Sequence, residues 1–148
     1  MQAPDFGNLI NSYIERNAAE TAGPLPCIVV GVDLPKGRVD VRPLINTLYQ
    51  DDTFEERPIV MGVPIIWPVT GHSAMTFPIN IGDSIFCIPA GANMDQFKMG
   101  NGQPFPPDDH RRNSEQDYIA IPGLTPFNRS VNNPVIRNWE HNVNDFVI

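Results

Sequence analysis

The densest group of titratable side chains in this sequence is the run Asp108-Asp109-His110-Arg111-Arg112. Carboxylates beside an imidazole are the ingredients of general acid–base catalysis or of metal binding. Adjacent residues in a loop, however, converge on one point only with help from the tertiary structure. Alternating charges of this kind are more typical of a loop held by salt bridges. We therefore interpret residues 108–112 as a structural polar loop and expect no catalytic residues and no enzyme, with a small hydrolase built on this run as an alternative.

No other pattern of nucleophiles or metal ligands stands out. The histidines lie far apart, at His72, His110 and His141. The sequence contains no Cys-x-x-Cys, His-x-His or His-Glu-x-x-His motif and no phosphate-binding glycine-rich loop. The cysteines, Cys27 and Cys87, lie inside apolar runs, where a free cysteine behaves as a small core residue. We therefore expect buried free thiols rather than a disulfide, no metal site and no cofactor.

The charge of the chain restricts its possible partners. Ten basic against seventeen acidic residues give the 148-residue chain a net charge of -7. Nucleic-acid binding depends largely on cationic contacts to phosphate, and docking on anionic lipid needs basic clusters, so neither is expected. Sixteen prolines and eleven glycines interrupt the chain too often for a helical bundle. No apolar run approaches the roughly 20 residues of a membrane-spanning helix, and no secretory signal pattern is visible.

One amphipathic helix is predicted over residues 5–20, within an N-terminal segment that spans 1–22. Its large apolar residues recur at the spacing of one helix face, and they are Phe6, Leu9, Ile10, Tyr13 and Ile14. Asp5 can act as the N-cap, and Gly23-Pro24 ends the helix. The apolar stripe either covers the domain's own core or docks on a partner chain. The sequence leaves both interpretations open, and the first four residues of the stripe are candidate interface residues.

From Pro26 onward the pattern becomes that of short strands. The run Arg38-Val39-Asp40-Val41-Arg42 alternates strictly between polar and apolar side chains, as in a hairpin with one solvated face. A polar, acidic loop is expected over 49–57 and a short helix over 93–99. Five or six strands separated by turns favour a mainly β fold, an OB-like Greek-key barrel over residues 23–126, rather than an immunoglobulin sandwich. The predicted strands cover residues 27–33, 38–42, 59–67, 75–79, 84–89 and 118–123.

Residues 127–148 are predicted to form an extended C-terminal arm. This segment is rich in asparagine and lacks helical periodicity, so its isolated apolar residues can be buried only against something else. The candidates for such contacts are Val135, Trp139, Val143 and Phe146.

Several blocks of the sequence resemble one protein family in their order and spacing. The first two are residues 23–33 (Gly-Pro-Leu-Pro-Cys-Ile-Val-Val-Gly-Val-Asp) and 37–43 (Gly-Arg-Val-Asp-Val-Arg-Pro). Others follow at 58–64, at 76–79 with Gly82-Asp83, and at 108–112 leading through Asp117 to 119–124. Together they resemble the N-terminal OB-fold domain of phage baseplate central spike proteins, the membrane-puncturing family.

The resemblance implies a homotrimeric structural protein of the virion, placed in the tail baseplate and assembled in the host cytoplasm. Its partners would be other copies of itself and the trimeric baseplate hub protein, on which the OB domains dock as a collar. A trimer would give each C-terminal arm two neighbouring arms to pack against, and the stripe of the N-terminal helix is a candidate interface with the hub or another partner. The host outer membrane would be a transient partner. In this family a β-helix or needle follows the OB domain, so residues 127–148 are its possible start, or a separate tip protein supplies it. The alternative is a stand-alone OB module that binds nucleic acid or an oligosaccharide.

Overall fold

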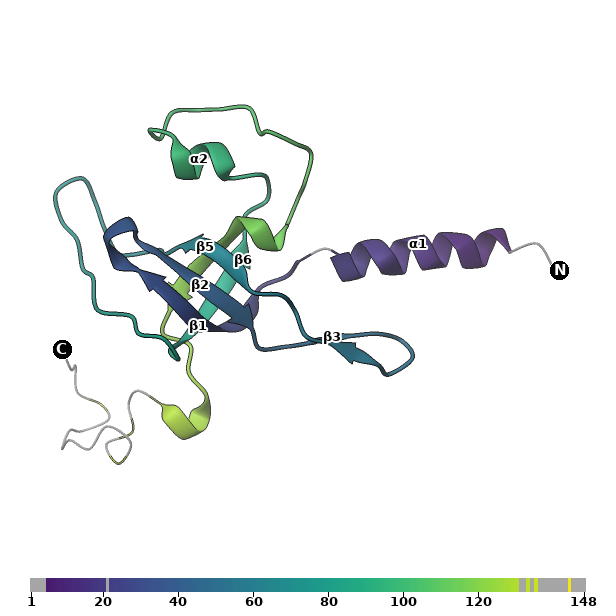
Figure 1. Cartoon of the computed structure of the whole chain (residues 1–148), viewed down its shortest axis with the longest axis horizontal. Helices are drawn as coiled ribbons and strands as arrows, with labels where there is room; N and C mark the ends of the chain where they lie inside the picture. The colour runs from purple at the N-terminus through teal and green to yellow at the C-terminus, as the bar shows by residue number, and fades with distance from the viewer. Residues whose placement is uncertain (1–4, 21, 131–132, 134, 136–143, 145–148) are drawn as a thin grey trace.

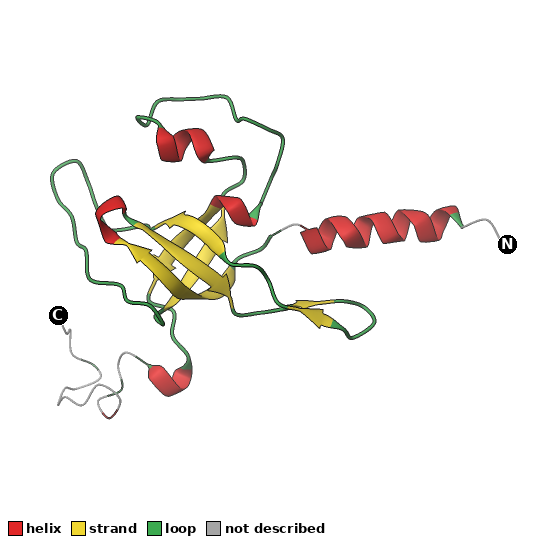
Figure 2. Ribbon diagram, viewed as in Figure 1, coloured by secondary structure: helices red, strands yellow, loops and turns green. Residues whose placement is uncertain are grey.

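The structure, a computed structural model, describes residues 5–20, 22–130, 133, 135 and 144. It is mainly β, with one long helix near the N-terminus and extended loops between short strands (Figure 1, Figure 2). The strands are β1 (Leu25–Asp33), β2 (Arg38–Pro43), β3 (Thr47–Leu48), β4 (Phe54–Glu55), β5 (Val60–Pro64), β6 (Ser84–Pro89) and β7 (Tyr118–Pro122). The helices are α1 (Phe6–Glu20) and α2 (Asp95–Met99), with the 3-10 turns η1 (Leu34–Lys36), η2 (Glu115–Asp117) and η3 (Phe127–Arg129).

Five of these strands form one curled antiparallel sheet in the order β5-β2-β1-β6-β7. The two edges of the sheet approach each other just after β5. There Ile65 bridges Ala120, and the Ile66 N–H donates to the Ala120 carbonyl at 2.9 Å. A curled sheet of this kind is typical of OB-like barrels. The predicted mainly β, OB-like fold with an N-terminal helix is therefore confirmed.

The hairpin of β1 and β2 forms where the alternating pattern predicted it. The connecting turn η1 ends at Gly37, whose φ of 64° lies in the left-handed region that glycine adopts without strain. A register shift between Val29 and Gly31 introduces a bulge into β1, and bulges increase the local twist of a strand. The bulge therefore helps the sheet to curl.

The core lies on the inner side of the curled sheet, and both cysteines belong to it as buried, free thiols, which confirms the prediction. The core residues are Ala22, Cys27, Val29, Val39, Val41, Val60, Val63, Ile79, Ile85, Cys87, Tyr118 and Ala120. Successive side chains of a strand point to opposite faces, so the residues between these positions face outward. On β1, β6 and β7 most of the outward residues are also apolar, and these apolar residues are half-buried. We call them the outer apolar face: Pro26, Ile28, Phe86, Ile88, Ile119 and Ile121.

Two local predictions were wrong. Residues 75–79 are irregular rather than a strand, because Pro78 lacks the N–H that a strand ladder needs. Within this segment Ile79 inserts into the core while Phe77 stays exposed and meets the Trp67 ring edge to face, with ring centroids 4.8 Å apart. The predicted acidic loop over 49–57 contains β4, which forms a small hairpin with β3 just before the loop, and Leu48 pairs with Phe54. Each of its strands has two residues, which is too short for a periodic pattern.

Helix α1 begins where the sequence predicted it. The Asp5 side chain accepts the Gly7 N–H at 3.2 Å, and the Asp5 carbonyl accepts the Leu9 N–H at 3.0 Å, as expected of an N-cap. From there α1 extends away from the sheet along the long axis of the molecule (Figure 1). Its apolar stripe is exposed, so the interpretation that the stripe covers the domain's own core was wrong. No helix in the described part of the chain is long and apolar enough to cross a membrane.

Helix α2 begins at Asp95, slightly later than the predicted helix over 93–99. The Asn93 side chain accepts the Asp95 N–H at 2.8 Å. Asn93 therefore stabilises the start of α2 from one position before the N-cap residue, Met94.

Candidate functional site

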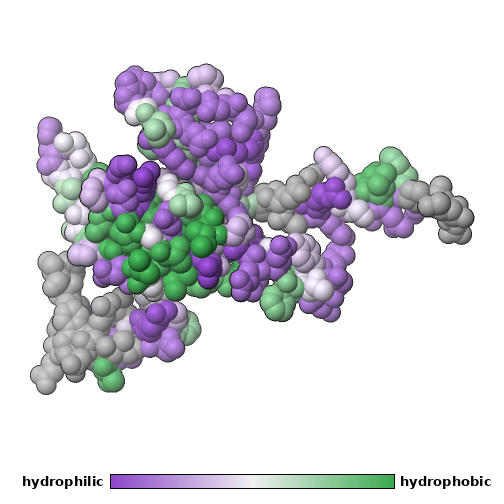
Figure 3. Space-filling view, in the orientation of Figure 1, coloured by the Kyte–Doolittle hydropathy of each residue, from purple (hydrophilic) through white to green (hydrophobic). Residues whose placement is uncertain are grey.

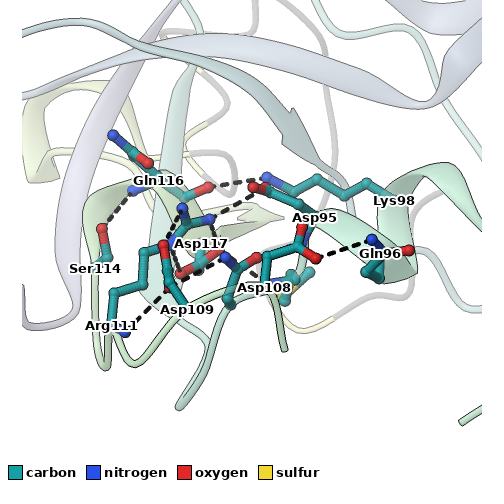
Figure 4. Close-up of polar contacts among 11 residues, drawn as sticks. Asp95, Gln96, Lys98, Asp108, Asp109, Arg111, Ser114, Gln116 and Asp117 are labelled. Atoms are coloured by element: carbon teal, nitrogen blue, oxygen red, sulfur yellow. Dashed lines mark hydrogen bonds and ion pairs between the residues drawn. The ribbon is translucent and has the colours of Figure 1, made fainter. Parts of the chain in front are cut away.

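A buried carboxylate stands at the centre of the polar cluster beside α2. Asp117, the last residue of η2, has no exposed side-chain surface. The long loop between α2 and η2 (Figure 2) places Arg111 against it, as Figure 4 shows. Arg111 Nε donates to Asp117 Oδ2 at 2.9 Å, and Nη2 donates to Oδ1 at 2.8 Å. This two-point contact is the strong, geometrically specific form of an arginine–carboxylate pair.

Helix α2 is joined to the same ion pair. The Met94 N–H donates to Asp117 Oδ1 at 3.0 Å, and Arg111 Nη2 also donates to Asp95 Oδ1 at 3.1 Å. Lys98 Nζ donates to the Gln116 carbonyl at 2.9 Å. The contacts therefore connect α2, the long loop and the residues that lead into β7.

The ion pair keeps both of its members charged. Burial alone would raise the pKa of Asp117, but the hydrogen bonds from Arg111 and from the Met94 amide outweigh it, so this carboxyl has a lowered pKa. The hydrogen bond to Asp117 is likewise the main reason why the pKa of Arg111 is raised. At neutral pH the cluster thus holds a fixed, paired carboxylate.

The first residues of the predicted polar loop extend this cluster. The buried Asn93 donates from Nδ2 to Asp109 Oδ1 at 3.2 Å, and the Arg111 backbone N–H donates to the same oxygen at 3.1 Å. These two hydrogen bonds lower the pKa of Asp109. Gln96 Nε2 donates to Asp108 Oδ1 at 2.9 Å. Both carboxylates thus accept hydrogen bonds from residues near α2.

The last part of the predicted loop lies differently. His110 and Arg112 are exposed, and neither side chain has a hydrogen bond or ion pair to another described residue. The imidazole therefore does not join the carboxylates. Asp95 and Asp117, which the sequence analysis did not select as site residues, take the central places instead. The position of Asp117 directly before the apolar run of β7 was the available signal, since a carboxylate there must be paired if it is buried.

The polar cluster holds elements of the same chain together. Asp117 accepts three hydrogen bonds and has no exposed side-chain surface, so a solute cannot reach its carboxylate. In the part of the chain that the structure describes, no group of three or more His, Cys, Asp or Glu side chains is arranged to hold a metal ion.

The predicted interface residues lie elsewhere. On α1, the stripe that begins at Phe6 is exposed, and Phe6 itself is 73% exposed. In the C-terminal arm, Val135 is 86% exposed. Trp139, Val143 and Phe146 lie outside the described residues, so their predicted role in a trimer interface remains a prediction.

The fold and the polar cluster together define a class of protein. It is a small OB-like domain in which the polar cluster holds loops of the same chain together and the apolar residues of α1 are exposed. Comparison with known families is consistent with this class, since the model of the phage protein Gp138 N-terminal domain matches residues 25–123. The match covers more than half of the chain, and the chain belongs to this family. It is therefore a bacteriophage protein, and the family supports a structural role in the phage. A comparison with curated proteins found no match.

Proposed function

We propose that this chain is a structural component of a contractile phage tail, the homotrimeric central spike or hub adapter of the baseplate. In this role three OB-like domains surround the tail axis, cap the tail tube and dock on a trimeric hub protein. The assembly transmits the force of sheath contraction and helps the tail to penetrate the host outer membrane. The C-terminal arm continues into the piercing tip, or a separate needle protein supplies it.

The observation that carries this proposal is exposed apolar surface on a member of a phage protein family. Monomeric soluble proteins rarely expose large contiguous apolar patches. In this chain α1 leaves a row of large apolar side chains in solvent, and the outer apolar face of the sheet adds a second, half-buried apolar surface. A monomer would leave both surfaces in water, whereas an assembly of several chains can bury them.

The polar cluster supports a mechanical role. A domain that transmits force needs loops that keep their positions, and the loop between α2 and η2 has little secondary structure of its own (Figure 2). The pair of Arg111 and Asp117 fixes this loop to the start of β7 by two short hydrogen bonds. Removing either partner of such a buried ion pair strongly destabilises the fold, because the other charge is left buried without a partner.

The mass of the purified chain in solution tests the proposal. Light scattering should give three times the chain mass of 16.5 kDa. The double variant with Trp139→Ala and Phe146→Ala should weaken the trimer, because these side chains are assigned to contacts between copies. A stable monomer would contradict the trimeric spike, and a monomer that also retards DNA on a gel would favour the stand-alone OB module.

A further inference from the structure

Within the described residues, two apolar surfaces remain at least partly exposed. The first is the α1 apolar stripe, whose residues range in exposure from 42% at Ile10 to 73% at Phe6. The second is the outer apolar face of β1, β6 and β7. No helix of the described chain packs across this face. The first surface is the apolar stripe of a helix, and the second is one face of a sheet. A helix packed on a sheet is one of the usual layer arrangements in folded domains.

The outer apolar face is continuous across three strands. Phe86 pairs with Pro26 on β1 and with Ile121 on β7, and Ile88 pairs with Ile119. Directly opposed side chains on one face of an antiparallel sheet are in contact range. On the next strand, β2, the outward positions are charged instead: Arg38, Asp40 and Arg42. Figure 3 shows hydrophobic residues gathered over the strands and bordered by hydrophilic ones.

We propose that α1 of one copy packs across the outer apolar face of a neighbouring copy. The dimensions agree, because the stripe from Phe6 to Ile14 is about 12 Å long at the helical rise of about 1.5 Å per residue. Three neighbouring strands span about 10 Å at the usual spacing of about 4.8 Å. The side chains of the stripe can therefore lie over all three strands of the face.

The occupant is a second copy because the connector after α1 is fixed to its own domain. Ala22 is buried in the core, and its N–H donates to the Asn113 carbonyl at 2.8 Å. The Gly23 carbonyl accepts a hydrogen bond from the Tyr118 hydroxyl at 3.3 Å. One residue separates these anchors from the end of α1, and the helix points away from its own sheet (Figure 1). The outer apolar face of a chain is therefore not covered by its own α1, and it remains available to another copy.

Charge favours the same arrangement. Helix α1 carries two acidic side chains and one basic side chain, and Asp5 at its N-terminus adds a third carboxylate, so the segment 5–20 has more acidic than basic residues. Arg42 pairs with Ile28 across β1 and β2 at the border of the outer apolar face, and it has no ion pair to another described residue. A negatively charged segment placed beside Arg42 would have the complementary charge that sets the orientation of a contact.

This inference rests on the proposed function, because it states which surfaces join the copies of the oligomer. The test uses the full chain with the photocrosslinking amino acid benzoylphenylalanine at position 13, in place of Tyr13. After irradiation, a denaturing gel should show covalent dimers, and mass spectrometry should map the crosslinks to β1, β6 or β7. The same label in place of Asn8, on the opposite side of α1, is the matched control. Its yield of covalent dimer should be lower by about tenfold or more.

A pair of variants measures the contribution of the stripe. Leu9→Asp with Ile10→Asp should raise the dissociation constant of the oligomer by about tenfold or more. Asn8→Asp with Asn11→Asp adds the same charge to the polar side and should change it little. Circular dichroism should show the wild-type sheet content in both double variants. A variant that does not fold would be identified by this measurement.

The outcomes separate this inference from the proposed function. A trimer that gives crosslinks between two α1 helices, crosslinks within one chain or no crosslinks overturns the inference and leaves the trimeric spike intact. A monomer by light scattering overturns both.

Discussion

Replacing Arg111 by alanine tests whether the ion pair with Asp117 holds the long loop to the sheet. The substitution removes two hydrogen bonds, at 2.9 and 2.8 Å, from a carboxylate with no exposed surface. It also removes the contact with Asp95 on α2. The Met94 amide then remains as a partner of a negative charge inside the protein.

The size of the effect follows from burial. Removing one member of a buried ion pair typically costs about 3–5 kcal/mol of unfolding free energy, because the other charge stays buried without compensation. An exposed ion pair would contribute about 0–1 kcal/mol. Since the Arg111 side chain is 21% exposed and that of Asp117 is fully buried, we expect a loss of about 3 kcal/mol. In a chain of this size, such a loss lowers the unfolding temperature by roughly 10 °C.

Urea unfolding followed by tryptophan fluorescence measures this loss. Arg112→Ala is the matched control, because Arg112 is the neighbouring arginine and is exposed. A substitution on the surface is expected to stay within about 0.5 kcal/mol of the wild type. Equal stabilities of the two variants, or a loss below about 1 kcal/mol in Arg111→Ala, would refute the assigned role of the cluster.

The same cluster predicts how the effect depends on pH. The pKa of Asp117 is lowered in the folded state, so its stabilisation is present above the unfolded value of about 3.9 and is lost as the pH falls through the folded value. In Arg111→Ala the buried carboxylate lacks its cation, so its pKa should rise and protonation should favour folding. The difference between wild type and variant should therefore begin to shrink as the pH falls through the raised pKa of the variant, and it should be smallest below the lowered pKa of the wild type. A difference that stays constant from neutral pH to pH 3 would speak against the buried ion pair.

Three further predictions concern the sheet and the connector that follows α1. Gly31→Ala should cost about 1–3 kcal/mol in urea unfolding, since its new Cβ would collide with the Asp40 side chain, whereas Gly71→Ala, with open space around it, should be nearly neutral. The hydrogen bond with Cys27, followed by burial, raises the pKa of the Cys87 thiol, so a thiol reagent should modify Cys87 only in denaturant. Rapid reaction of the native protein would contradict the burial of this thiol. Tyr118→Phe should lose about 1 kcal/mol in thermal unfolding because its hydroxyl donates to the connector carbonyl at 3.3 Å, and unchanged stability would show that this bond does not hold the connector.

The sheet could be predicted from the sequence because its strands follow a local rule. Alternation of polar and apolar residues over 38–42 has the period of a strand with one solvated face, and the structure contains β2 there. The β3–β4 hairpin could not be predicted in this way, because strands of two residues contain no period. The strand prediction for residues 75–79 was wrong for a different reason. Ile79 packs in the core and Phe77 contacts the Trp67 ring, and neither contact requires strand pairing.

The polar cluster could be located from the sequence, but its contacts could not. The run of charges drew attention to Arg111, yet its partners Asp117 and Asp95 lie 6 and 16 positions away. These partners depend on how the loop between α2 and η2 folds, and no local pattern encodes that path. The outer apolar face could not be predicted either. In an unbroken apolar run such as Cys27-Ile28-Val29-Val30, the sequence does not indicate which side chains face outward.

A cryo-EM map of the tail of the phage that encodes this chain tests the central claim most directly. We expect three copies of the curled five-stranded sheet around the tail axis at the baseplate, in contact with a trimeric hub. A complete baseplate map in which the axial position is filled by another protein, with this chain absent from the virion, would contradict it.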